Sequence, residues 1–320
     1  MAGEFDLIRR HFARATQHTD LGVGDDGALL RTRPGMQLVV SSDMLVSGTH
    51  FFPDAEPEAL GWKTAAANIS DMAAMAAEPR WITLALALPE SNDKWVEAFA
   101  NGFSACCTSF GVDWIGGDTT RGPLNLCATV FGEVPHGQAV VRSGARAGDE
   151  LWISGTPGLA ALGLQHLLGN IELPEGARTA CLSALHRPQP RVALGLALRG
   201  VATAMLDVSD GLLGDLGHIL ERSNCGALIE DALLPLAPVL SASGDEAQAR
   251  RALLSGGDDY ELLFAAPLSQ RQAVLDAAQR IGLPVTRIGA VTDQANVILL
   301  QGKDGARSPL AARGFDHFGS

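Results

Sequence analysis

The sequence has little lysine and no paired cysteine motif, and both shortages exclude classes of protein. It contains 21 Arg but only 3 Lys, and its formal net charge is −12. A general nucleic-acid binder needs clustered positive charge, so we expect no nucleic-acid partner. The 5 Cys include no Cys-x-x-Cys pair, which argues against a zinc site or a disulfide framework. We therefore expect free, buried thiols and binding of anions only at local sites.

Long apolar runs are missing as well. No stretch approaches the roughly 20 apolar residues of a membrane-spanning helix. Residues 1–15 have the pattern of an amphipathic helix with charges throughout, without the apolar segment of a secretory signal. We therefore expect a cytoplasmic protein with no membrane partner.

Several common catalytic motifs are also absent. The only Gly-Lys pair, Gly302-Lys303, is followed by Asp304, so the chain has no G-x-x-x-x-G-K-[ST] phosphate loop. It has neither the H-E-x-x-H motif of zinc hydrolases nor the G-x-S-x-G turn of α/β-hydrolases. If the protein handles phosphate, it must use metal ions, backbone N–H groups and arginine side chains.

The chain does contain alternating helix and strand patterns over 320 residues, of which 47% are hydrophobic. This is enough for one large or two ordinary domains. The polar, glycine-rich stretch 142–149 marks a boundary, and we predict domains over 1–146 and 147–320. In the first half the patterns predict helices at 56–77 and at 91–110, the second capped by Ser91, and strands at 37–42, 83–88, 112–115 and 124–134. After a strand that starts at Leu151, they predict helices near 157–168, 178–185, 191–199, 211–223, 245–254 and 268–281, and strands near 203–207, 226–230, 260–266, 285–291 and 296–300.

The most informative residues are aspartates in short motifs that contain Gly or Ser, most of them beside an apolar run. They are Asp25, Asp26, Asp43, Asp71, Asp118, Asp207, Asp210, Asp258 and Asp259. Carboxylates at strand ends gather at the rim of a sheet, where they repel one another unless a cation lies between them. Mg²⁺ takes oxygen ligands and commonly shares them with phosphate. Together the aspartates predict a site for several metal ions and phosphate.

Each aspartate also has an ordinary structural explanation. Glycine turns account for Asp26 and Asp118, and a helix N-cap accounts for Asp210. Asp71 lies inside an alanine-rich helix pattern, where Asp is unfavourable, so a metal ligand and a capping residue are about equally favoured. The nine aspartates fall into six short motifs. The predicted metal site depends on all six together, because none is specific alone.

Other residues have two interpretations. His50 fits a packed core histidine, or a ligand contact seven residues after Asp43. Arg142 and Arg146 fit solvated surface arginines, or a phosphate clamp near the domain boundary. The aromatic tail Gly314–Phe318 suggests docking onto the fold and stacking on a flat ligand.

Several of these motifs occur in a fixed order. They are Ser41-Ser42-Asp43-Met44-Leu45-Val46, Asn68-Ile69-Ser70-Asp71, Gly116-Gly117-Asp118-Thr119, Asp207-Val208-Ser209-Asp210-Gly211-Leu212, Gly256-Gly257-Asp258-Asp259-Tyr260-Glu261-Leu262 and Gly314-Phe315-Asp316-His317-Phe318. The ordered set resembles thiamine-monophosphate kinase, a family of the PurM-like ATP-binding superfamily, from about Phe5 to Phe318. The resemblance implies a PurM-like architecture, with an α/β N-terminal domain that binds ATP and metal and an α+β C-terminal domain. It also implies a homodimer joined through the N-terminal sheets.

The resemblance further implies ATP-dependent phosphorylation of thiamine monophosphate to thiamine diphosphate. By position, it implies Mg²⁺ ligands at Asp26, Ser42, Asp43, Asp71, Asp118, Asp207 and Asp210. It implies ATP contacts at Gly117, Asp118, Arg142 and Ser209, and contacts with the thiamine phosphate at His50, Glu261 and Phe315. Asn101 stands where the resemblance would place an aromatic residue against adenine, so no residue is assigned to the adenine.

The chemistry then follows from charge. Both reactants are anionic, so several Mg²⁺ ions are expected to neutralise them for in-line transfer of the γ-phosphoryl group of ATP. A phosphate nucleophile is already ionised near neutral pH. We therefore expect no essential catalytic histidine, no covalent nucleophile and no phosphoenzyme.

Other functions use the same acids. Another PurM-like synthetase, of the aminoimidazole ribonucleotide or selenophosphate type, is the nearest alternative. The selenophosphate type carries a reactive Cys near its N-terminus, whereas the first cysteine here is Cys106. A metal-dependent phosphatase would use water as nucleophile and release free phosphate, and a nucleotide sensor would not need so many ligands.

Overall fold

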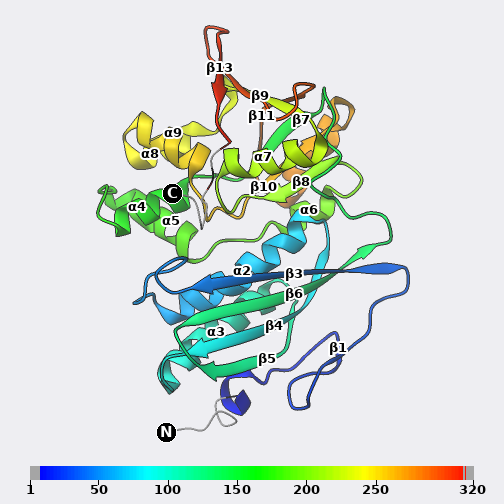
Figure 1. The fold of residues 1–320 in the computed structure, drawn as a ribbon, viewed down its shortest axis with the longest axis vertical. Coiled ribbons are helices and arrows are strands. Elements are labelled where there is room, and N and C mark those ends of the chain that lie inside the picture. Colours follow the sequence, from blue (N-terminus) through cyan, green and yellow to red (C-terminus); the bar gives the residue numbers. More distant parts are fainter. Residues whose placement is uncertain (1–7, 313, 315–320) are drawn as a thin grey trace. The chain divides into compact units, whose positions relative to one another are not determined.

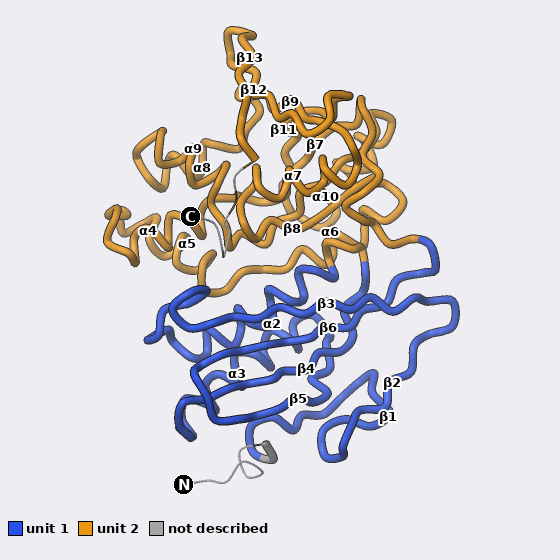
Figure 2. The backbone as a smooth tube through the Cα atoms, in the orientation of Figure 1, with its two compact units in different colours: residues 1–72, 77–137 blue, residues 73–76, 138–320 orange. Residues whose placement is uncertain are grey.

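The computed structural model describes residues 8–312 and 314, which form two compact units (Figure 2). The first comprises Met1–Met72 and Ala77–Gly137, and the second comprises Ala73–Ala76 and Gln138–Ser320. The sequence placed the boundary later, between residues 146 and 147.

Hydrogen bonds explain why the segment after residue 137 groups with the second unit. The Val140 N–H donates to the carbonyl of Met75 at 3.3 Å. The N–H groups of Gly144 and Ala145 donate to Ser223 Oγ at 3.1 and 3.2 Å. The polar, glycine-rich composition that suggested a linker therefore belongs to a loop held on the second unit.

The first unit is built on a four-stranded sheet with the order β3-β6-β4-β5. The strands are β3 (Met36–Val46), β4 (Glu78–Leu88), β5 (Asp113–Arg121) and β6 (Asn125–Pro135). Strand β6 pairs antiparallel with both β3 and β4, and β5 pairs parallel with β4. This arrangement makes β3 and β5 the two edges of the sheet.

Two helices, α2 (Pro57–Ala74) and α3 (Asp93–Ser109), cover one face of this sheet (Figure 1). On β6, alternate residues such as Leu126, Ala128 and Val130 are buried, as expected for a strand with one covered face. The predicted N-cap of α3 is wrong by one residue. The cap is Asn92, whose side chain accepts the Trp95 N–H at 3.2 Å, whereas Ser91 precedes it.

A short hairpin and a single helical turn precede the sheet. The turn is a π-helix, Ile8–Phe12, and the hairpin pairs β1 (Thr19–Leu21) with β2 (Leu29–Leu30). The carboxylate of Asp113 accepts the N–H groups of Gln17 and His18 at 2.8 and 2.6 Å and so fastens this segment to β5. The helix predicted for residues 1–15 is therefore a five-residue turn in its described part.

The second unit is built on a seven-stranded sheet with the order β13-β12-β9-β11-β7-β10-β8. Its strands are β7 (Glu150–Ser154), β8 (Ala204–Asp207), β9 (Gly226–Glu230), β10 (Leu262–Ala266), β11 (Val285–Thr292), β12 (Ile298–Gln301) and β13 (Arg307–Leu310). Every pairing is antiparallel except β9 with β12.

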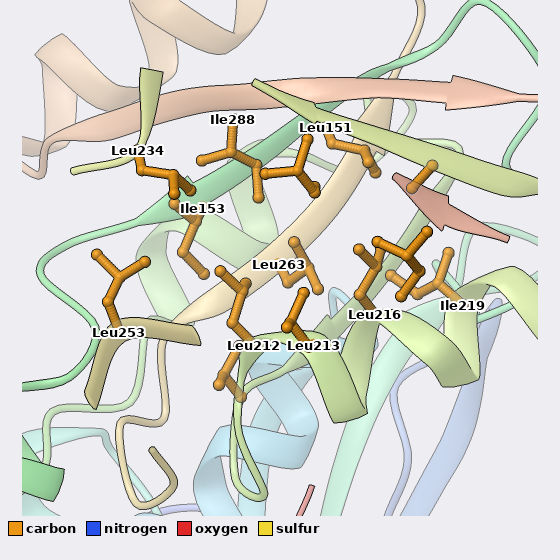
Figure 3. Packing of buried hydrophobic residues seen from close by; sticks show 14 of the residues in the cluster. Leu151, Ile153, Leu212, Leu213, Leu216, Ile219, Leu234, Leu253, Leu263 and Ile288 are labelled. Carbon is orange, nitrogen blue, oxygen red and sulfur yellow. The ribbon is translucent and has the colours of Figure 1, made fainter. Parts of the chain in front are cut away.

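Helices cover both faces of this sheet. They are α4 (Leu159–Leu167), α5 (Glu175–His186), α6 (Val192–Ala197), α7 (Leu212–Ser223), α8 (Leu236–Ser243), α9 (Glu246–Ser255) and α10 (Arg271–Ile281), with short 3₁₀ turns at Asp231–Leu233 and Leu268–Gln270. Leu263 of β10 packs into one core with α7, as Figure 3 shows, and its neighbour Phe264 packs into the other. A strand that is covered on both faces, as β10 is, has a continuous run of apolar residues in its sequence.

No helix in the described part of the chain combines the length and apolar character needed to cross a membrane.

Candidate functional site

The predicted ligands Asp43 and Asp71 are brought to one place, where β3 packs on α2. The Asp43 N–H donates to Asn68 Oδ1 at 3.1 Å. The Ser41 hydroxyl donates to Asp71 Oδ2 at 2.6 Å. Asn68 is itself buried and donates to the Thr64 carbonyl at 3.0 Å. Asp71 is therefore a helix residue that faces a strand, and its partner is a hydroxyl of that strand.

Ser42 and Asp118 lie on the other face of the same sheet. Ser42 lies between Ser41 and Asp43 on β3, so its side chain points to the opposite face from theirs. Its hydroxyl contacts Thr129 Oγ1 on β6 at 2.9 Å. The pairing register aligns Asp118 with Ala85, an exposed residue on the uncovered side of β4. Because β3 and β5 are opposite edges, three strand spacings, about 14 Å, separate them. The sheet therefore does not bring Asp118 to the β3 carboxylate.

Gly117, which precedes Asp118, has a structural reason to be glycine. Its φ is +154°, and a Cβ there would lie 1.8 Å from the carbonyl oxygen of Leu84 on β4. The close approach of the two strands thus excludes any side chain. The fold therefore requires glycine at position 117 whether or not this residue contacts ATP.

Asp26 and His50 lie in turns of the first unit. Asp26 is exposed between β1 and β2, and its N–H donates to Asp25 Oδ1 at 3.0 Å. His50 lies after β3, where the Val46 N–H donates to His50 Nδ1 at 3.0 Å. Because Nδ1 accepts this bond, a neutral His50 ring carries its proton on Nε2.

In the second unit, two of the predicted motifs run side by side. Segment 207–210 follows β8, and segment 258–261 precedes β10. The Val208 N–H donates to the Glu261 carbonyl, and the Asp258 N–H to the Ser209 carbonyl, both at 2.8 Å. The predicted residues Asp207, Ser209, Asp210 and Glu261 therefore belong to one neighbourhood.

A further acid, Asp215, supports this neighbourhood. Its Oδ2 accepts the N–H groups of Ser209 and Asp210, each at 3.0 Å. Burial, with a smaller contribution from the charges of Asp207 and Asp210, raises the pKa of Asp215 to about 7. Three carboxylates therefore crowd one poorly solvated place, where a cation would relieve their repulsion. The donor set of hard oxygens suits Mg²⁺.

Glu261 is buried, and Asp259 is half-buried beside it. Asp259 accepts the Gly158 N–H at 2.8 and 2.9 Å, at the start of α4. Burial raises the pKa of Asp259 well above its usual range. Glu261 accepts the Ser154 hydroxyl at 2.5 Å and the Arg191 guanidinium at 2.5 and 2.7 Å. Sequence reasoning missed Asp215, Ser154 and Arg191, although Arg191 ends a proline-rich Arg-Pro-Gln-Pro-Arg segment.

Arg142 lies in an exposed loop that Ser223 holds. The Ser223 hydroxyl donates to the Arg142 carbonyl at 3.1 Å and accepts two loop N–H groups. Arg146 is also exposed, and its N–H donates to Asp149 Oδ2 at 3.0 Å. Asn101 is exposed on α3. Phe315 lies outside the described residues, with most of the aromatic tail.

The predicted ligands thus form one pair on β3 and α2 and one crowded group after β8. Within the residues described, no three or more His, Cys, Asp or Glu side chains are arranged to hold a metal ion by themselves. Mg²⁺ usually takes only one or two protein carboxylates and completes its shell with phosphate oxygens and water. The acids present fit that mode of binding.

Both halves of the chain match known families. Residues 24–134 match the N-terminal domain of AIR synthase related protein, and residues 146–300 match its C-terminal domain. Thiamine-monophosphate kinase of Escherichia coli (strain K12) is 43% identical over 320 residues, which cover 99% of this chain and 98% of the relative.

Solved structures agree with these matches. The crystal structure of thiamine-monophosphate kinase from Stenotrophomonas maltophilia K279a has a TM-score of 0.84 at 45% identity, covering 90% of this chain and 92% of that chain. The structure of AaThiL complexed with AMPPCP and TMP has a TM-score of 0.77 at 29% identity and covers 92% of each chain. The matches confirm the predicted PurM-like pair of domains, one α/β and one α+β.

Proposed function

Because the chain belongs to the thiamine-monophosphate kinase family, we propose that it transfers the γ-phosphoryl group of ATP to thiamine monophosphate and forms thiamine diphosphate. The observation that carries the proposal is 43% identity to a curated thiamine-monophosphate kinase across 99% of the chain. A relative of the same fold, AaThiL, has been solved with AMPPCP and TMP bound, which supports ATP and thiamine monophosphate as the two substrates.

We assign the acids of both units to Mg²⁺. The proposed ligands are Asp26, Ser42, Asp43, Asp71, Asp118, Asp207 and Asp210. When bound, Mg²⁺ neutralises phosphate oxygens and holds the two anionic reactants together. Support comes from the crowding of Asp207 and Asp210 around Asp215, and from the pair that Asp43 and Asp71 form on β3 and α2.

The protein's own groups orient the reactants. We assign Gly117, Asp118, Arg142 and Ser209 to ATP. His50 and Phe315 are assigned to contacts with thiamine monophosphate, and Glu261 to the substrate site as a residue that positions its neighbours. His50 would donate through Nε2, because its Nδ1 already accepts the Val46 N–H. The accepting phosphate is ionised at neutral pH, so in-line attack needs no general base from the protein.

We also propose a homodimer that forms through the uncovered face of the first unit's sheet. On β3, Leu38, Val40 and Met44 alternate on this face and are 47%, 52% and 53% exposed. Val40 pairs with Phe131 and Met44 with Cys127 on β6, which extends the apolar surface. A second copy of the chain would bury this surface against itself. We place the enzyme in the cytoplasm, where ATP is abundant and its five free cysteines stay reduced.

The reaction can be tested by incubating the protein with ATP, Mg²⁺ and thiamine monophosphate and separating the products by chromatography. We expect one thiamine diphosphate for each ADP formed. Parallel reactions with free thiamine or with aminoimidazole precursors should give no phosphorylated product. Release of free phosphate without thiamine diphosphate would identify a phosphatase and refute the proposal.

A further inference from the structure

We propose that Arg191 binds a phosphate oxyanion of a bound substrate, and that Glu261 acts by positioning Arg191. This inference rests on the proposed function, and it adds to the site a residue that the ordered motifs do not contain. The two side chains form a bidentate ion pair within the second unit.

The Glu261 carboxylate has no capacity left for a ligand. Its Oε2 accepts the Ser154 hydroxyl at 2.5 Å and Arg191 Nε at 2.7 Å. Its Oε1 accepts Arg191 Nη2 at 2.5 Å and the Thr156 N–H at 3.4 Å. A carboxylate offers about four lone-pair sites, and these four donors occupy them. A substrate could bond to Glu261 only by displacing one of its present donors.

The structure around Glu261 is shaped to hold this arrangement. Gly155 has φ +60°, and a Cβ there would lie 1.8 Å from Glu261 Oε1, so only glycine lets the carboxylate lie against the chain. The Ser154 hydroxyl donates to Glu261 and accepts the Leu262 N–H at 2.9 Å, which fixes its direction. The Glu261 carboxylate is thereby held in a fixed position and orientation, in which it binds Arg191.

Arg191 is the member of the pair that reaches solvent. Its side chain is 25% exposed, against 5% for Glu261. A guanidinium has five N–H donors, of which Glu261 takes two. The described residues supply no acceptor for the other three, on Nη1 and Nη2. The segment leading to Arg191 contains Pro188 and Pro190, which limit its backbone freedom, and helix α6 begins directly after it.

The edge of the Arg191 guanidinium formed by Nη1 and Nη2 is suited to bind a phosphate. Two parallel N–H groups match two phosphate oxygens, and the positive charge strengthens both hydrogen bonds. The ion pair with Glu261 holds the fork in a fixed orientation, so that little freedom is lost when the anion binds. Both substrates of the proposed reaction carry phosphate, and the test below distinguishes them.

The test compares steady-state kinetics of four variants with the wild type. Arg191→Gln removes the fork and leaves Glu261 unpaired. Arg191→Gln with Glu261→Gln removes the fork without an unpaired buried charge. Arg191→Lys keeps the charge and loses the planar fork. Arg178→Gln, an exposed arginine on α5, makes the same charge change away from the site.

We expect Arg191→Gln to raise the KM of one phosphate substrate about 10- to 100-fold, the value of a lost charge-assisted hydrogen bond. A rise for thiamine monophosphate identifies the accepting phosphate, and a rise for ATP identifies the nucleotide. The double variant should remain as impaired as the single one, Arg191→Lys should lie between, and Arg178→Gln should match the wild type.

Recovery of both wild-type KM values in the double variant would overturn the inference, because Arg191 would then serve only to neutralise Glu261. Unchanged KM values in Arg191→Gln or Arg191→Lys would overturn it as well. Thiamine diphosphate formation by the wild type is measured in the same assay. An active wild type with unaffected variants therefore refutes only the role of Arg191, whereas an inactive wild type refutes the proposed function.

Discussion

At the scale of single residues, two acids hold the backbone beside the proposed ligands. Asp215 accepts the N–H groups of Ser209 and Asp210, and Asp259 accepts the N–H of Gly158 at the start of α4. Asp215 is buried and Asp259 is half-buried, and both set the direction of the backbone next to the site. A buried N–H group without an acceptor is costly, so each acid is needed for the local geometry.

Asp215 gives a prediction at this scale. Asp215→Ala leaves two N–H groups without their acceptor, and we expect kcat/KM for ATP to fall about 10- to 100-fold. In Asp215→Asn the side-chain oxygen still accepts both bonds, so kcat/KM should stay within about three-fold of the wild type. Steady-state kinetics with Asp276→Ala, an exposed aspartate of α10, provide the matched control. Equal loss in the alanine and asparagine variants would show that the charge, and not the hydrogen bonds, is what matters.

The residues that sequence reasoning found and missed differ in how their partners lie along the chain. Asp43, Asp71, Asp207 and Asp210 stand out because each belongs to a local motif beside Ser or Gly. Arg191 gives no such signal, since its partner Glu261 is 70 positions away. Contacts of that range depend on the folded sheet and cannot be read from local spacing.

At the scale of elements, β3 presents different side chains on its two faces. Ser41 and Asp43 face α2, whereas Leu38, Val40 and Met44 face away from the helices and are exposed. The same strand can therefore present a carboxylate on one side and an apolar surface on the other. A one-residue shift of its register with β6 would exchange the two faces.

This strand gives the second prediction. Val40→Glu places a charge on the proposed dimer surface, and two copies would bring like charges together. We expect a dimer for the wild type and a monomer for this variant in analytical ultracentrifugation at micromolar concentration. Leu268→Glu replaces a leucine that is 61% exposed in the second unit and should remain dimeric. A monomeric wild type, or a Val40→Glu dimer of unchanged stability, would contradict the proposed interface.

Patterns predicted elements with a clear apolar run or period and missed elements without one. Strand β9 matches its predicted range of 226–230, because an apolar run with a glycine start is unambiguous. Helix α8 was missed, since its eight residues include Pro238 in the first turn. Strand β13 was also missed. It pairs with β12 in the folded sheet, and its Arg-Ser-Pro-Leu sequence has no strand pattern of its own.

At the scale of the whole molecule, each of the two units contributes its own group of acids. The first supplies Asp43 and Asp71 on β3 and α2, and the second supplies Asp207 and Asp210 beside Asp215. The order of the motifs along the sequence was enough to predict the family and the two-domain fold, which the matches confirm. The assignment of individual ligands is a proposal, because it depends on ions and phosphates that complete the coordination.

The central claim is that the proposed ligands, Asp43 and Asp118 among them, bind the Mg²⁺ on which phosphoryl transfer depends. The most direct measurement is the rate of thiamine diphosphate formation against Mg²⁺ concentration for the wild type, Asp43→Asn and Asp118→Asn. We expect the wild-type rate to require Mg²⁺ and to vanish with a chelator. Both variants should lose orders of magnitude in rate at limiting Mg²⁺ and recover in part at high Mg²⁺. Full activity of both variants at limiting Mg²⁺ would contradict the account.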